Sequence, residues 1–217
     1  MNVAILSESA ADEAAVRLLV EAVLGQPVEL VPPRYRARGW GAIPDTIAAT
    51  VPAVYYSHSG SAEGLVVVLD SNSSPVHTGA VAALCDDVRC RLCMARRAVA
   101  RAVGKLRAVV HRGPLRTAVG LAVPAIEAWY LCGNDPNVSE NAWVQARAEG
   151  QRPYPPNQLK ERVYGTDRPS LERETACATR EAVRIASDLD MLERKFPIGF
   201  GALRSALGNW VAPKTDA

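Results

Sequence analysis

The stretch Gly64-Leu-Val-Val-Val-Leu-Asp70 decides the fold class of this chain of 217 residues. It is an uninterrupted apolar run, rich in valine, that ends in an acid and is followed by the polar turn Ser71-Asn-Ser-Ser-Pro75. Such a run is typical of a central parallel strand that is buried on both faces. We therefore expect an α/β fold with Asp70 at the carboxyl end of a strand.

The chain before this stretch predicts a first strand that leads into a helix. Residues 2–6 are apolar, Ser9 is a good helix N-cap, and Asp12 suits the positive end of the helix dipole. Gly25 marks the end of the helix. The i, i+3, i+4, i+7 spacing of a buried helical face is made by Val16, Leu19, Val20 and Val23. Glu8 is therefore expected at the tip of the first strand.

Segments after Asp70 continue the alternation of strands and helices. A further strand is expected at residues 119–123, and residues 106–111 are read as another strand or as the edge of a β-ribbon. Helical composition or spacing marks residues 78–104, 124–131 and 171–195, and a short last helix that ends near Trp210. Pro124 is expected at the first helical position, which places Glu127 in the first turn. Residues 32–52 are read as a loop with at most one short helix at 45–49.

This alternation implies a mostly parallel sheet with helices on both faces. We predict an α/β domain over residues 1–150 and a C-terminal helical extension over residues 151–217. The extension is expected to pack on the domain and not to fold independently of it.

Three acids are expected at one edge of this sheet. Ligands of open α/β sheets bind beyond the carboxyl ends of the strands, where Glu8, Asp70 and Glu127 are placed by the pattern. Carboxylates held close together repel one another and call for a cation, and a hard ion such as Mg²⁺ or Mn²⁺ prefers oxygen ligands. Taken singly, each acid has a plainer interpretation as a helix cap, a partner of a helix dipole or a solvated strand end.

Several segments of the chain resemble one family. They are Ile5-Leu-Ser-Glu-Ser-Ala-Ala-Asp-Glu13, the strand end Leu69-Asp-Ser-Asn72 and, most specifically, Val123-Pro-Ala-Ile-Glu-Ala-Trp-Tyr-Leu131. The later Leu159-Lys-x-x-x-Tyr164 and Phe196-Pro-x-x-Phe200 segments are similar too. Together they resemble the TOPRIM-like domain of unknown function 4276 family, which is related to the TOPRIM domain of OLD-type nucleases. The resemblance implies a TOPRIM or Rossmann-like fold.

The resemblance also implies a function. It suggests a bacterial nuclease dependent on Mg²⁺ or Mn²⁺, in which Glu8 and Asp70 take the metal-binding positions of the family. With the acidic edge predicted above, we expect Glu8, Asp70 and Glu127 as catalytic acids and the same three with Asn72 as metal ligands, where Glu127 is either a third ligand or a base. Nucleic acid, DNA rather than RNA, would be the substrate, and an OLD- or SMC-like ATPase of an anti-phage defence system the partner. Asn72 stands where the family usually has a second aspartate. That substitution favours the alternative, a catalytically inactive docking or regulatory subunit of such an ATPase.

Two other enzyme classes fit the sequence less well. The first strand is not followed by the G-x-G-x-x-G of dinucleotide-dependent oxidoreductases, and the chain has no G-x-S-x-G serine-hydrolase elbow. A basic stripe on the 78–104 helix suggests contact with phosphates. It comprises Arg96, Arg97, Arg101 and Lys105, with Arg89 about two turns before Arg96. The plainer interpretation is a solvated helix face.

Cysteine and histidine spacing does not favour a zinc site in the sequence. Cys90 and Cys93 form a C-x-x-C, but a second matched pair is missing and the surrounding residues read as helical. The histidines His58, His77 and His111 are scattered. Five cysteines without a secreted-type framework, no signal peptide and no long apolar run suggest reduced thiols, no membrane and a cytoplasmic protein. A homo-oligomer is compatible with this sequence.

Overall fold

A five-stranded parallel sheet forms the centre of the molecule in the computed structural model, which describes residues 1–31, 35–36, 42–57, 61–77, 80, 83–154 and 157–211. The strands are β1 (Asn2–Ser7), β2 (Glu29–Leu30), β3 (Tyr35–Arg36), β4 (Gly64–Asp70) and β5 (Arg116–Ala122). Their order is β2-β1-β4-β5, and β3 pairs with β1 beyond β2. The predicted α/β class is confirmed.

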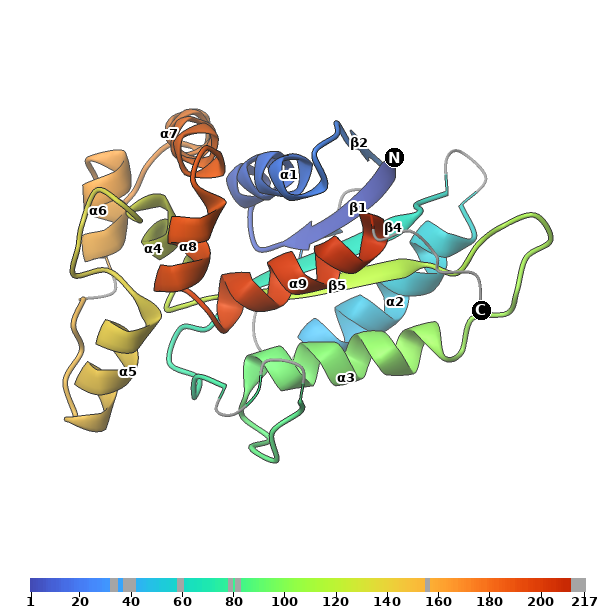
Figure 1. Cartoon of the computed structure of the whole chain (residues 1–217), viewed down its shortest axis with the longest axis horizontal. Coiled ribbons are helices and arrows are strands. Elements are labelled where there is room, and N and C mark those ends of the chain that lie inside the picture. The colour runs from blue at the N-terminus through green and yellow to red at the C-terminus, as the bar shows by residue number, and fades with distance from the viewer. Residues whose placement is uncertain are drawn as a thin grey trace.

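Helices cover both faces of this sheet (Figure 1). On one face lie α1 (Ala10–Leu24) and α9 (Gly199–Val211), which pack against each other, and on the other lie α2 (Ile43–Tyr55) and α3 (Arg91–Val103). The remaining helices gather beyond one end of the strands: α4 (Ile126–Tyr130), α5 (Glu140–Ala148), α6 (Gln158–Tyr164), α7 (Leu171–Ala186) and α8 (Leu189–Lys195). The buried apolar side chains of strands and helices form one continuous core.

The strand order creates a switch point between β1 and β4. From β1 the chain moves outward to β2 in one direction, while β4 and β5 lie in the other. Val3 to Leu6 of β1 pair with Gly64 to Val67 of β4. In open α/β sheets the crevice at such a point is where ligands bind. Glu8 and Asp70 lie at the carboxyl ends of these two neighbouring strands.

The C-terminal segment is built into the domain. Helix α7 packs along α1, and α9 packs along β5. The ring of Phe200 in α9 also meets the ring of Trp129 in α4 edge to face at 5.5 Å. The approach is close at Gly199, because a Cβ atom there would lie 1.8 Å from the carbonyl oxygen of Leu121. Helices α6 to α9 therefore complete the core around the sheet.

Several predicted element boundaries are wrong. The helix predicted for residues 78–104 covers only Arg91–Val103, because the described residues before Arg91 form turns. Residues 106–111 form turns and loop in place of a strand, and α4 begins at Ile126 because Ala125 is still extended, with φ −149°.

Two more helices differ from their predicted extent. The helix predicted at 171–195 is two helices, since Asp188 leaves the helical conformation and caps α8. Helix α2 is longer than the predicted 45–49 and contains Pro52, because Ile47, Val51 and Val54 bury one of its sides.

No helix in the described part of the chain combines the length and the apolar character needed to cross a membrane.

Candidate functional site at the carboxyl edge of the sheet

The structure places the three predicted acids at the same edge of the sheet. Glu8 follows β1, Asp70 ends β4, and Glu127 lies in α4 just after β5. One carboxylate oxygen of Glu8 accepts a hydrogen bond from the backbone N–H of Asp70 at 3.1 Å. One oxygen of Asp70 accepts from the N–H of Ile126 at 2.9 Å. These bonds connect the ends of the three central strand segments through the acids themselves.

Burial and mutual repulsion favour the protonated forms of these acids. Burial is the largest influence on Asp70 and raises its pKa well above the ordinary value, and the charges of Glu127 and Glu8 raise it further. Burial also raises the pKa of Glu127 from 4.5 to about 7 and raises that of Glu8. Ionising these groups together therefore calls for a compensating cation.

Two further acids belong to this cluster and were not assigned to it from the sequence. Asp12 of α1 raises the pKa of Glu8, Asp70 and Glu127, and Glu174 of α7 raises that of Glu127. Asp12 also completes a capping box, since the Ser9 N–H donates to its carboxylate at 3.0 Å. The sequence signal for Asp12 is its place in the first turn of the helix that begins just after Glu8.

Arg91 is the buried cation of this edge. Its guanidinium lies 4.0 Å from a carboxylate oxygen of Glu8 and donates to the backbone carbonyl of Asp70. The Arg91 side chain is only 5% exposed. Its charge lowers the pKa of Glu8, yet burial has the larger effect and that pKa stays raised. Lys160 of α6 acts in the same direction on Glu8 and Glu127.

The donor set at this edge fits a hard divalent cation. The ligand atoms on offer are carboxylate oxygens, and Mg²⁺ retains several waters and needs only one or two carboxylates from the protein. The carboxylates of the edge are neighbours without converging on one point. Among the described residues, the group of candidate ligands whose atoms all lie within 4.8 Å of one another contains no acid. The residues present therefore suit an ion held partly through water.

A groove opens beside the acids. A pocket of about 250 Å³ is lined by residues just beyond the ends of β4 and β5, namely Asn72, Pro124 and Ala125. Arg152, in the loop after α5, lines it too. This pocket shares Ser73, Trp143 and Arg147 with a larger cleft of about 650 Å³.

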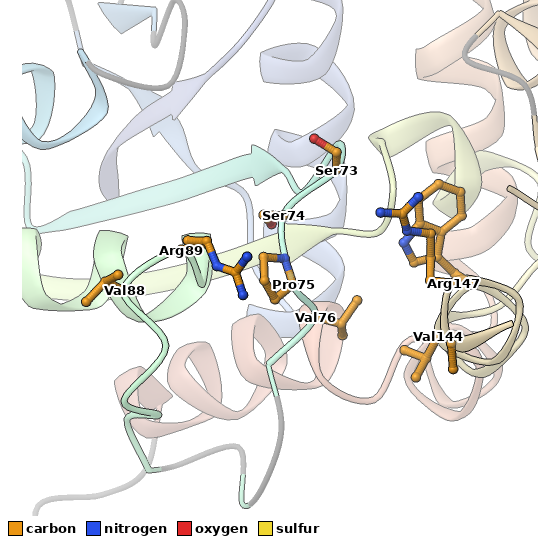
Figure 2. Close-up of a pocket in the computed structure, with 10 residues that line it drawn as sticks. Ser73, Ser74, Pro75, Val76, Val88, Arg89, Val144 and Arg147 are labelled. Carbon is orange, nitrogen blue, oxygen red and sulfur yellow. The ribbon is translucent and has the colours of Figure 1, made fainter. Parts of the chain in front are cut away.

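Figure 2 shows how side chains lie around the larger cleft. Arg147 of α5 lies on one side of the loop that carries Ser73 to Val76, and Arg89 lies on the other. Asn72 has φ +50°, a left-handed conformation that asparagine tolerates. The groove thus joins the acidic edge to three arginines, Arg89, Arg147 and Arg152.

The predicted basic stripe lies along α3 and just after it, away from the acidic edge. Arg97 donates to the backbone carbonyl of Cys85, and half-buried Arg96 interacts electrostatically with Cys90 and Cys93. Arg101 and Lys105 are exposed and line a separate pocket between α2 and α3. Arg91, the first residue of α3, lies beside Asp70. Arg101 is about 15 Å from Arg91 along the helix axis and therefore lies away from the acidic edge.

Comparisons with known proteins add no assignment. No protein-family model matches the chain, and searches of curated proteins and of solved structures find no significant match.

Proposed function

We propose that this chain is a magnesium-dependent phosphodiester-cleaving protein that acts on nucleic acid. The observation that carries the proposal is the set of acids at the carboxyl edge of the sheet: half-buried Glu8 and Asp70 at the β1/β4 switch point and buried Glu127 after β5. Their pKa values are raised by desolvation and by neighbouring negative charge. Magnesium bound there would neutralise charge on the scissile phosphate and lower the pKa of a coordinated water. The resemblance to TOPRIM-like domains is the reason for proposing nucleic acid as the substrate.

Residues of this chain would bind the ion, exchange the proton and bind the substrate phosphates. Glu8 and Asp70 would hold the ion, since each already fixes one carboxylate oxygen in a backbone hydrogen bond. Glu127, with a pKa of about 7, would exchange a proton near neutral pH, as general acid–base catalysis requires. Arg147 and Arg152 would bind phosphates that enter along the groove from Asn72.

Arg91 favours a second candidate function. Its buried guanidinium already lies between Glu8 and the end of β4, and so supplies part of the positive charge that an ion would bring. Together with Asn72 in place of an acid, this arrangement suits a TOPRIM-like subunit that docks on or regulates an ATPase without cleaving nucleic acid.

A cleavage assay tests the proposed function. Purified chain, alone and with any OLD- or SMC-like ATPase that proves to be encoded beside it, is incubated with DNA or RNA and Mg²⁺ or Mn²⁺. Cleavage should require the metal and be lost in Asp70→Ala and Glu8→Ala. Glu140→Gln is the matched control, because Glu140 is also a buried acid with a pKa of about 7 but binds the Ile198 and Gly199 N–H groups.

The outcomes separate the two candidates. Cleavage that depends on Asp70 but not on Glu140 supports the enzyme. If every substrate stays intact while the ATPase requires this chain for its stability or turnover, the docking function replaces it.

A further inference from the structure

Four metal-binding side chains converge next to the acidic edge. His77, Cys85, Cys90 and Cys93 place their ligand atoms within 4.8 Å of one another. The Nδ1 atom of His77 lies 3.2 Å from the Cys93 sulfur and 3.9 Å from the Cys90 sulfur, and the Cys85 and Cys93 sulfurs are 3.5 Å apart. His77, Cys90 and Cys93 are buried, whereas Cys85 is half-buried.

These separations match a tetrahedral zinc site. Zinc–sulfur bonds of about 2.3 Å and zinc–nitrogen bonds of about 2.0 Å put neighbouring ligand atoms about 3.6–3.8 Å apart in a tetrahedron. The observed distances of 3.2, 3.5 and 3.9 Å bracket that spacing. Three cysteines and one histidine form a closed ligand set, which is the type found in structural zinc sites and not in catalytic ones.

The second nitrogen of His77 supports the same conclusion. Nε2 lies 3.2 Å from the backbone carbonyl oxygen of Ala80. An N–H at that position donates to the carbonyl, so the lone pair is left on Nδ1, the atom that faces the sulfurs. A metal-binding histidine typically has such a carbonyl partner, which fixes its tautomer and ring orientation.

Several neighbouring groups favour negative sulfur, although burial raises the pKa of the Cys90 thiol to about 12. Cys90 is the N-cap of α3 and Cys93 lies in its first turn, where the helix dipole favours anions. The backbone N–H of Cys85 donates to the Cys93 sulfur at 3.2 Å. Arg96 interacts electrostatically with Cys90 and Cys93. These contacts explain why Arg96, predicted to bind nucleic acid, is half-buried against this cluster.

From this geometry we infer that His77, Cys85, Cys90 and Cys93 bind one structural Zn²⁺ ion. Binding converts three thiols to thiolates and releases their protons to solvent. The ion would fasten the connection between β4 and α3, residues 71–90, whose described part contains no helix or strand. Such a long irregular segment in a compact domain calls for a stabilising element of its own.

The zinc site would also shape the neighbouring groove and acids. Residues 73–76, just before His77, and Val88 and Arg89, just before Cys90, line the 650 Å³ cleft of Figure 2. Arg91 follows Cys90 directly and contacts Glu8 and Asp70. The ion therefore fixes both a groove wall and Arg91 at the acidic edge.

Metal analysis of the whole chain tests this inference without reference to nuclease activity. The protein is purified natively under reducing conditions, and bound metals are measured by mass spectrometry. One zinc per chain is expected. Replacing zinc with Co²⁺ should give the intense visible absorption of a tetrahedral cobalt–thiolate centre, with a sulfur-to-metal charge-transfer band.

Variants assign the ligands. Cys90→Ser and Cys93→Ser should lose stoichiometric zinc, while Cys132→Ser, at a buried cysteine outside the cluster, should retain it. Because a lost ligand can also prevent folding, His77→Cys provides a second measurement. It should keep one metal and shift the cobalt spectrum toward that of four thiolates.

The following results would overturn the inference. They are a reduced, folded chain that contains no zinc and takes up none, an octahedral cobalt spectrum, and an unchanged spectrum in His77→Cys. Iron in place of zinc would also exclude the assignment.

Discussion

Replacing Glu127 by glutamine, its neutral isostere, should change the pH dependence of stability. The Glu127 pKa is about 7 in the fold against 4.5 ordinarily, and the side chain is buried. Between these values the folded state binds the proton that the unfolded state has released, so this group makes the protein less stable as pH rises from 4.5 to 7. At about 1.4 kcal/mol per pH unit, the full loss is about 3 kcal/mol.

Glu127→Gln removes this loss, and denaturant unfolding at pH 5 and pH 8 with chelator present measures it. Relative to wild type, the variant should gain up to about 3 kcal/mol of unfolding free energy between pH 5 and pH 8. Glu140→Gln should show a similar gain, since burial also raises the Glu140 pKa to about 7. An unchanged difference between Glu127→Gln and wild type at the two pH values would refute the reasoning.

Magnesium separates the two variants. A cation at the acidic edge stabilises the ionised acids, so Mg²⁺ should raise the unfolding free energy of wild type and of Glu140→Gln at pH 8. Glu127→Gln should gain less. Equal gains in unfolding free energy in all three proteins would show that Glu127 does not contribute to the metal site and is a buried structural acid.

Three further predictions follow from the same geometry. Asn72→Asp, which the left-handed backbone also tolerates, should tighten Mg²⁺ binding roughly tenfold, measured by calorimetry, and unchanged affinity would place residue 72 outside the site. Arg147→Ala with Arg152→Ala should weaken nucleic-acid binding and make its dependence on salt concentration less steep. An unchanged salt dependence would show that these two arginines do not contact the phosphates. Gly199→Ala should cost at least about 2 kcal/mol in denaturant unfolding because its Cβ overlaps the Leu121 carbonyl. Gly208→Ala, with open space around the Cβ, should be neutral or stabilising, and equal effects would contradict this packing argument.

The acidic edge was predictable because it depends on strand periodicity. A buried apolar run fixes where a parallel strand ends, and the residue after that run must lie at the ligand-binding edge. Glu8 and Asp70 meet this condition directly. Glu127 is at the same edge although its helix begins two residues later than predicted, because its place depends on the end of β5.

The partners of these acids were not predictable in the same way. Arg91 was not singled out, and the 78–104 segment that contains it was expected to be helical throughout. Glu174 and Lys160 come from helices far along the chain, and no local pattern links them to β1 or β4. Long-range packing of α7 on α1 brings Glu174 to the edge.

Composition alone predicted a helix that begins at residue 78, whereas the helix begins at Arg91. The many alanines and the absence of proline in residues 78–90 favour a helix on propensity alone, but propensity is a weak preference that tertiary contacts override. A continuous helix would have carried His77 and Cys85 along its axis, away from Cys93. The turns before Cys90 return both residues to the C-x-x-C, so the missing second ligand pair comes from the irregular segment.

The acidic edge and the cysteine cluster are connected through three consecutive features of the chain. Asp70 ends β4, the irregular segment returns to Cys90, and Arg91 then reaches back to the carbonyl of Asp70. A loop of this length would leave the position of Arg91 poorly fixed, whereas a metal bound one residue earlier limits it to the first turn of α3. Loss of zinc should therefore release Arg91 from Glu8 and Asp70 and leave the acids with even less compensating charge. On this argument the two sites are coupled: the state of the cysteine cluster changes the affinity of the acidic edge for its cation, and Mg²⁺ titrations before and after zinc removal would measure that coupling.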